Sequence, residues 1–236
     1  MTRRGDLDQF YSLLQTLDER VGGAERLGDC TGYMDWPDRG VYIFLAPGET
    51  RESTPFPRVT RIGTHAVSAG SSTSMWDRLR THRGANGGTY EGGGNHRGSV
   101  FRKRVGEAIL ERDALHGEYP QWGNGSTANR EQRLSELALE RRVSEYLRDL
   151  RFLWIAVDDE PGPESDRAYL ERNAIALLSN RGGEAIDPRK EAWLGHHSRS
   201  AAIRESGLWN VDHVDETHDP AFLSTLESYV EGTDPA

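Results

Sequence analysis

Two different periods of apolar residues run along the chain, and they separate expected helices from expected strands. β-Branched and aromatic runs such as Arg39–Leu45 (RGVYIFL) indicate strands. The segment 84–98, with seven glycines, and the residues beyond Arg181 lack a clear period and are expected to form loops. Helices are expected over residues 7–21, 74–83, 100–112, 130–147 and 166–179, and strands over residues 39–45, 58–64 and 151–157.

This order of elements predicts an α+β fold, in which helices flank a small, mainly antiparallel sheet of about three core strands. The first two strands most simply form a hairpin with a long connection. The single cysteine, Cys30, excludes a disulfide framework and a cysteine-based zinc site. No apolar run approaches the roughly 18 residues of a membrane span, and the N-terminus lacks a signal-peptide core. We therefore expect an intracellular, cytoplasmic protein.

The formal net charge of −9 is unusual for a protein that binds DNA, but the charges are unevenly distributed. Residues 205–236 hold eight acidic side chains and no Lys or Arg, whereas residues 51–111 hold ten basic and five acidic side chains. The net charge therefore does not exclude nucleic acid as a partner. It predicts a localised basic groove with an acidic flank, and low affinity for non-specific DNA at high salt.

Arg78 and His82 lie four residues apart in the expected helix 74–83 and therefore share one face of it. Met75 and Leu79 lie close to this face, so the two polar side chains belong to an inward-looking patch. Burial of such groups is costly unless an anion meets them. The alternative is structural, with an arginine that extends to water beside a hydrogen-bonded histidine.

Glu171 lies in the middle of an apolar stripe on the expected helix 166–179. A buried carboxylate at such a position costs several kcal/mol unless it pairs with a cation or a metal. Two interpretations remain open, an internal ion pair with a core arginine, or a metal ligand or general base. The stripe consists of Ala168, Ala174, Ile175 and Leu178.

Two strand motifs and two helix segments occur in an order that resembles the GIY-YIG nucleases. Residues 40–42 (GVY) and 61–63 (RIG) resemble the paired strand motifs of that family. Residues 78–82 (RLRTH) match the arginine and histidine of the helix that follows, and residues 170–175 (LERNAI) resemble the segment with the metal-binding glutamate. The resemblance covers roughly residues 39–180.

The resemblance implies three parts of the chain. Residues 39–180 would form a GIY-YIG-like catalytic core with an insertion around 84–125. Residues 1–38 would form an N-terminal helical extension, and residues 181–236 a C-terminal extension with an acidic tail.

The resemblance also implies a metal-dependent DNA endonuclease, and the residue types suit that chemistry. Glu171 would hold one Mg²⁺ or Mn²⁺, and Arg78 would clamp the scissile phosphate. Tyr42 would lie beside the nucleophilic water as base or orienter. His82 would hydrogen-bond Tyr42 or relay its proton.

One position departs from the family pattern, because Arg61 stands where the second motif has tyrosine. An arginine is effectively always protonated and is a poor base. Tyr42, or His65 four residues after Arg61, would then deprotonate the water, although His65 also fits an ordinary loop position. Asn180 corresponds to an asparagine that follows the glutamate helix in the family, at a shorter spacing than expected.

The glycine-rich segment 92–98 superficially resembles a phosphate-cradling loop, but it lacks a Walker-type pattern, which argues against a nucleotide cofactor. Basic residues within and after it form either a DNA-contacting arm or a solvated loop. The residues concerned are His96, Arg97, Arg102 and Lys103, and Arg80 on helix 74–83 is a further candidate for a contact with DNA or a supporting role.

Two tryptophans and two adjacent histidines in the C-terminal part raise the question of a metal or stacking site. Adjacent histidines without a helical or hairpin partner are a weak metal signal, and tryptophans are more often core residues. The residues are Trp193, His196, His197 and Trp209.

Three functions from different classes fit these observations. The first is the metal-dependent endonuclease, cutting duplex or branched DNA, and the second is a catalytically inactive nucleic-acid-binding module of the same fold, motivated by Arg61 and the acidic tail. The third is a protein-interaction domain that uses the tryptophan-containing C-terminal part. Cleavage of both strands by an enzyme with a single site would suggest a homodimer.

Overall fold

The computed structural model describes residues 2–51, 54, 56–68 and 70–233. Met1 of the expected N-terminal extension and residues 234–236 of the acidic tail lie outside the described residues. So do three positions in the connection between the two hairpin strands and one position after the second strand.

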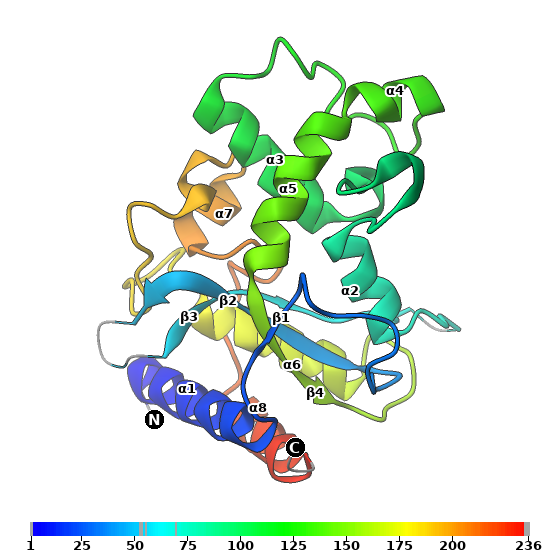
Figure 1. The fold of residues 1–236 in the computed structure, drawn as a ribbon. Helices are drawn as coiled ribbons and strands as arrows, with labels where there is room; N and C mark the ends of the chain where they lie inside the picture. The colour runs from blue at the N-terminus through cyan, green and yellow to red at the C-terminus, as the bar shows by residue number, and fades with distance from the viewer. Residues whose placement is uncertain (1, 52–53, 55, 69, 234–236) are drawn as a thin grey trace.

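An antiparallel sheet forms the centre of the molecule (Figure 1), with four strands among the described residues. The strands lie in the order β1-β4-β2-β3, so β2 is hydrogen-bonded to β3 on one side and to β4 on the other. The expected hairpin and the three expected core strands are confirmed, and the short β1 is an addition. Their bounds are Glu25–Arg26 (β1), Gly40–Thr50 (β2), Pro57–Gly63 (β3) and Arg151–Ala156 (β4).

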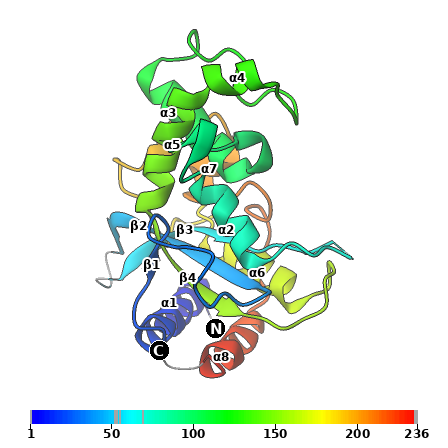
Figure 2. The same ribbon diagram turned by 45° about the vertical axis from the view of Figure 1, so that its right-hand side comes forward.

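Helices cover both faces of this sheet (Figure 2), which confirms the expected α+β class. One face carries α1 (Arg3–Arg20), α6 (Asp166–Leu178) and α8 (Phe222–Glu231), and the other carries α2 (Met75–Arg83), α3 (Val100–Asp113) and α5 (Leu137–Asp149). Shorter helices are α4 (Arg130–Ser135), α7 (Ala201–Ser206) and the 3₁₀ turns η1 (Gly88–Tyr90), η2 (His96–Gly98) and η3 (Leu194–His197). None of the described helices is long and apolar enough to cross a membrane.

Alternation along β2 divides the core into two apolar layers. Val41, Ile43 and Leu45 pack with α1, α6 and α8, whereas Tyr42 and Phe44 pack with α2, α3 and α5. Because successive strand residues point to opposite faces, the tyrosine of the first motif necessarily lies on the side of α2.

The C-terminal residues differ most from what the sequence pattern predicts. Loops were expected beyond Arg181, yet α7 and α8 form there, and Trp209 is fully buried. Helix α8 lies beside α1 beneath the sheet (Figure 1). Its first turn has no side-chain cap, so its stability comes from the apolar face that α1 and α6 cover. The expected helix 130–147 is also divided, with α4 and α5 meeting at Glu136.

We predict that Phe222→Ala lowers the free energy of unfolding by about 3–5 kcal/mol, because it removes a fully buried aromatic ring of α8. Chemical denaturation followed by circular dichroism measures the change. Ser224→Ala, at an exposed position of the same helix, is the control and should change the stability by less than about 0.5 kcal/mol. Equal stability of the two variants would show that α8 is not part of the core.

Candidate active site

Helices α2 and α6, which carry the candidate residues, have well-defined ends. Ser74 caps α2 through a capping box with Asp77, and Gly84 ends the helix with φ of 85°. Ser165 caps α6 by accepting a hydrogen bond from the backbone N–H of Ala168. These ends fix which side chains of each helix face the sheet.

Tyr42 and His82 form a buried hydrogen-bonded pair between β2 and α2. The Tyr42 hydroxyl lies 3.1 Å from Nε2 of His82, and both side chains are fully buried. Nδ1 of His82 lies 2.8 Å from Oγ of Ser99, which also accepts a hydrogen bond from the Arg102 N–H as the N-cap of α3. This favours a Ser99 hydroxyl that donates to Nδ1, with the imidazole proton on Nε2 and directed at Tyr42.

The surroundings of His82 keep its ring neutral. Burial, followed by the charges of Arg78, Arg61 and Arg102, holds the pKa of His82 well below its usual range. A proton placed on this imidazole would be desolvated and repelled by three arginines. This favours a neutral ring, and the Ser99 contact favours the tautomer that directs the Nε2 hydrogen at Tyr42.

The glycines of the two strand motifs make room for this pair. Gly63 lies opposite Tyr42 in the β2–β3 ladder, and a Cβ atom there would overlap the Tyr42 ring and hydroxyl. A Cβ atom on Gly40 would overlap the carbonyl oxygen of Ile155 and the methyl group of Met75. Neighbouring atoms approach both positions so closely that only glycine fits. This explains why the first tripeptide begins with glycine and the second ends with it.

Glu171 of α6 lies at the end of β3. Burial raises the pKa of its carboxyl group, while the charges of Arg61 and His213, the backbone N–H of Thr64 and the charge of Arg78 act in the opposite direction. The carboxylate is thus partly desolvated but surrounded by groups that favour its charged form.

The ion pairs of α6 in the described part of the chain do not involve Glu171. They join Arg167 to Asp159 and Arg172 to Glu216. The internal ion pair, one of the two interpretations of the apolar stripe, is therefore absent from the described residues.

Arg61 lies on the same face of the sheet as Tyr42, because it pairs with Phe44 in the β2–β3 ladder. Its NH1 group donates to the carbonyl oxygen of Trp209 at 3.1 Å, and its guanidinium lies 4.8 Å from the ring centroid of Phe101. Its Nε is buried without a partner among the described residues. An unsatisfied buried donor is costly, and an anionic ligand would satisfy it.

Arg78 is half-buried, and its NH1 group makes a long hydrogen bond of 3.5 Å to the carbonyl oxygen of Gly98. Most other basic side chains of residues 51–111 are neutralised by carboxylates, so they do not form the expected basic groove. The paired residues are Arg51, Arg58, Arg80, Arg97, Arg102 and Arg104. Arg61 and Arg78 stand out as cations beside Glu171.

His65 lies next to this site in a fixed position. Its Nε2 is 3.0 Å from the carbonyl oxygen of Asp38, and its own carbonyl oxygen accepts from the buried Arg167. Burial, followed by the charges of Arg167, Arg78 and Arg39, lowers the pKa of His65, and its Nδ1 has no partner among the described residues. His65 is thus a loop residue whose imidazole is buried.

The basic residues after the glycine-rich segment form a buried network against α5. Arg102 and His96 both bind Glu140, with His96 Nδ1 3.0 Å from Oε1, and the Arg97 side chain is buried against Glu136. Both interpretations of these residues, a DNA-contacting arm or a solvated loop, placed them in solvent, whereas the side chains of His96, Arg97 and Arg102 are buried against carboxylates. Arg102 instead supports the site, since its NH1 donates to the carbonyl oxygen of His82 at 2.7 Å.

Three further residues that the sequence suggested for the site make their contacts elsewhere. Lys103 donates to the carbonyl oxygen of Gly123 at 2.9 Å, and Arg80 pairs with Asp77 on the surface of α2. The amide of Asn180 is engaged by backbone atoms of residues 187 and 206. Asn180 thus ties the chain together after α6.

The tryptophans of the C-terminal part are core packing residues, which was the alternative to a metal or stacking site. Trp193 and Trp209 are buried with ring centroids 5.3 Å apart, and Nε1 of Trp209 donates to the Tyr146 hydroxyl at 3.2 Å. No group of three or more His, Cys, Asp or Glu side chains suited to a metal occurs within the described ranges. A cation at Glu171 would rely on few protein ligands.

The sequence did not single out Ser99 or His213, and it raised Trp209 only for a metal or stacking site. Ser99 follows the loop as a hydroxyl N-cap, a signal that was present in the sequence. Trp209, which accepts from Arg61, and His213, which lies near Glu171, come from a segment without a period. Nothing local in that segment indicates contact with β3.

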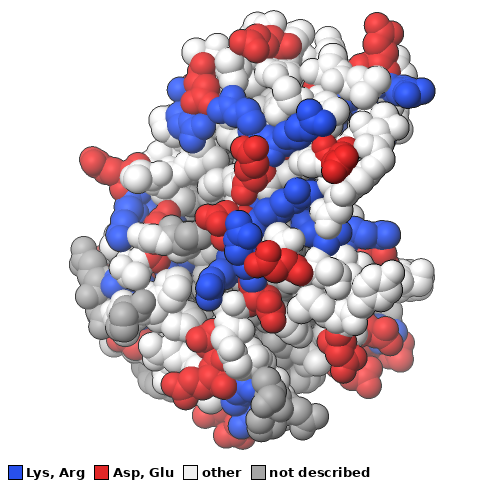
Figure 3. All heavy atoms as spheres, viewed as in Figure 1, with Lys and Arg blue, Asp and Glu red and all other residues white. Residues whose placement is uncertain are grey.

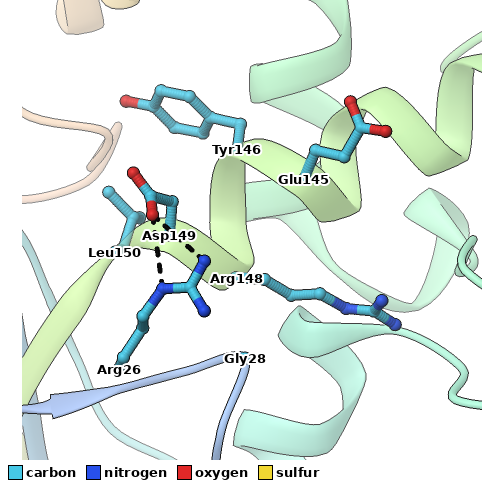
Figure 4. A pocket seen from close by; sticks show the side chains of 7 residues that line it. All are labelled: Arg26, Gly28, Glu145, Tyr146, Arg148, Asp149 and Leu150. Carbon is cyan, nitrogen blue, oxygen red and sulfur yellow. Dashed lines mark hydrogen bonds and ion pairs between the residues drawn. The ribbon is translucent and has the colours of Figure 1, made fainter.

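A pocket of about 570 Å³ lies between β1 and α5 (Figure 4) and contains none of these site residues. Arg26 faces Asp149 across it, with Nε 3.3 Å from Oδ1. Basic and acidic side chains are interspersed over this face of the molecule (Figure 3). The mutual pairing of the pocket's charges makes it a poor anion site.

Comparison with protein families agrees with the geometry. Residues 1–236 match a family model described as "GIY-YIG domain", so the chain belongs to this family, whose members are nucleases. No curated protein and no solved structure showed a significant match to the chain.

We predict that His82 makes the protein less stable in acid. The folded-state pKa lies below the ordinary value of 6.5, so below pH 6.5 the unfolded chain binds a proton that the folded chain excludes. Stability should therefore fall, by up to about 1.4 kcal/mol per pH unit from this group, as the pH drops below 6.5. Urea denaturation of wild type and His82→Gln at several pH values measures it. The variant should show the shallower slope, and identical slopes would mean that His82 is not a buried neutral imidazole.

Proposed function

We propose that this protein is a metal-dependent DNA endonuclease that hydrolyses phosphodiester bonds. The observation that carries the proposal is the meeting of a buried Tyr42–His82 pair, two arginines without carboxylate partners and the carboxylate of Glu171 at one end of β3. Membership of a family of nucleases supports it.

Arg78 and Arg61 are suited to bind the scissile phosphate. A guanidinium group is permanently charged, and its fork matches two phosphate oxygens. Arg78 is the more exposed of the two and would clamp the phosphate, while the unpaired Nε of Arg61 offers a second donor from the sheet. Arg61 would thus bind the negatively charged phosphate at the position where the second motif of the family has a tyrosine.

Glu171 fits a hard divalent cation such as Mg²⁺ or Mn²⁺. Its carboxylate is partly desolvated and unpaired among the described residues, and such ions accept one carboxylate together with waters and phosphate oxygens. When bound, the ion supplies positive charge that stabilises the transition state of phosphodiester hydrolysis. Without it, the carboxylate would repel the substrate, so a site built only to bind DNA has no use for Glu171.

Tyr42 would orient the attacking water. His82 donates to its hydroxyl, and the three arginines near His82 disfavour transfer of the proton onto the imidazole. With one lone pair taken by His82, the tyrosine hydroxyl keeps its own hydrogen and its other lone pair for the water, and a proton relay through His82 is disfavoured.

We predict metal-dependent nicking of supercoiled plasmid by the purified protein. Glu171→Gln should abolish nicking under Mg²⁺ or Mn²⁺, and Arg78→Ala should slow it by about 10²–10³-fold, the usual cost of removing one group that stabilises transition-state charge. Agarose gels of a time course measure both rates.

Two controls accompany these variants. Glu227→Gln and Arg130→Ala change exposed residues of the same types outside the site, and both should cleave at the wild-type rate. If Glu171→Gln and Arg78→Ala also cleave like the wild type, the proposed site is wrong. Salt-sensitive DNA binding without cleavage under any divalent ion would instead identify a binding module of the same fold.

A further inference from the structure

The chain between α7 and α8 follows the outer edge of β3 towards the site. The backbone N–H of Trp209 donates to the carbonyl oxygen of Thr60 at 2.8 Å. Asn210 then binds both backbone groups of Ile62, accepting from its N–H at 3.1 Å and donating to its carbonyl oxygen at 2.8 Å. The next residues along this edge therefore approach Thr64, whose N–H acts on the carboxylate of Glu171.

His213 is the residue that this path presents at the end of β3. Its φ is 63°, in the left-handed region that few residues other than glycine adopt, with Asn, Asp and His the most frequent among them. The following residue, Val214, is held by its carbonyl oxygen, which accepts from the Ser179 hydroxyl at 2.7 Å. Backbone of this kind persists where surrounding contacts impose it, and such positions concentrate at functional sites.

A carboxylate fixes the orientation of the His213 ring. Nδ1 lies 2.8 Å from Oε1 of Glu216, and Oε2 of Glu216 accepts from Nε of Arg172. A carboxylate only accepts, so Nδ1 carries the hydrogen, and in the neutral ring this leaves the lone pair on Nε2. Arg172 directly follows Glu171 in α6, so the orienting group is anchored beside the proposed cation ligand.

The arrangement matches the way proteins prepare a histidine for a metal. Ligand histidines commonly donate their second N–H to a carboxylate, which sets the tautomer and makes the free nitrogen more basic. The His213 side chain is 36% exposed, so solvent and ions reach it. The ring also lies near enough to influence the carboxyl group of Glu171.

We propose that Nε2 of His213 is a second protein ligand of the cation held by Glu171, oriented by Glu216 and Arg172. This inference rests on the proposed function, because it concerns the same site. A carboxylate and an imidazole together favour a first-row transition ion over Mg²⁺, which prefers oxygen ligands, so the site should bind Mn²⁺ more tightly than Mg²⁺. The simplest competing explanation is that Arg172, Glu216 and His213 only tie the C-terminal segment to α6.

Pulsed electron paramagnetic resonance of Mn²⁺ bound to the full-length protein distinguishes the two, because a coordinated imidazole adds a nitrogen coupling. We expect this coupling in the wild type and its loss in His213→Asn, with Mn²⁺ affinity by calorimetry lowered on the order of 10–100-fold. Asparagine is chosen because it tolerates positive φ, and a melting curve checks the fold. His197→Asn, an exposed histidine outside the site, is the control and should retain both coupling and affinity.

The outcomes separate the two proposals. A wild type without nitrogen coupling, or a coupling that persists in His213→Asn, overturns the role of His213. If Glu171→Gln removes Mn²⁺ binding in that case, the proposed metal site stands without His213. Unchanged Mn²⁺ affinity in Glu171→Gln, or no Mn²⁺ binding by the wild type, contradicts both proposals.

Discussion

The close packing of the Tyr42 ring over Gly63 is the constraint on which the site depends. Tyr42 sits in β2, which is bonded to strands on both sides, so its direction is fixed by the sheet. The missing side chain at position 63 lets the hydroxyl reach His82 across the apolar layer beneath α2. A buried hydroxyl needs such a partner, and a neutral histidine supplies it without adding charge to a layer that already holds arginines.

Most basic side chains near the site are paired with carboxylates, so few remain to bind an anionic ligand. The total of −9 does not describe the site, because acidic side chains such as Glu136 and Glu140 pair with the buried side chains of Arg97 and Arg102. Arg61 and Arg78 have no such partner in the described part of the chain, and their charges act on the carboxyl group of Glu171. The two arginines and the Glu171 carboxylate carry opposite charges in a partly desolvated site. Such a site favours a phosphate, which meets the arginines, together with a metal cation, which meets the carboxylate.

The local signals in the sequence predicted the hairpin, the third strand and the helices that carry the candidate residues. The spacing of Arg78 and His82 and the apolar stripe around Glu171 placed these three side chains on faces that meet the sheet. The sequence could not show that the segment with Trp209 and His213 runs along β3, because those contacts join residues about 150 positions apart. For the same reason the basic residues near position 100 looked exposed, since their carboxylate partners lie about 40 positions away.

The central claim is that Tyr42 orients the water while the arginines bind the phosphate. Single-turnover cleavage by Tyr42→Phe tests it most directly, because the ring stays over Gly63 and only the hydroxyl is lost. We expect a cleavage rate lower by about 10²-fold or more with unchanged DNA affinity, as for loss of a group that acts on the reacting proton. Cleavage at the wild-type rate would contradict the claim, and would show that another group positions the water.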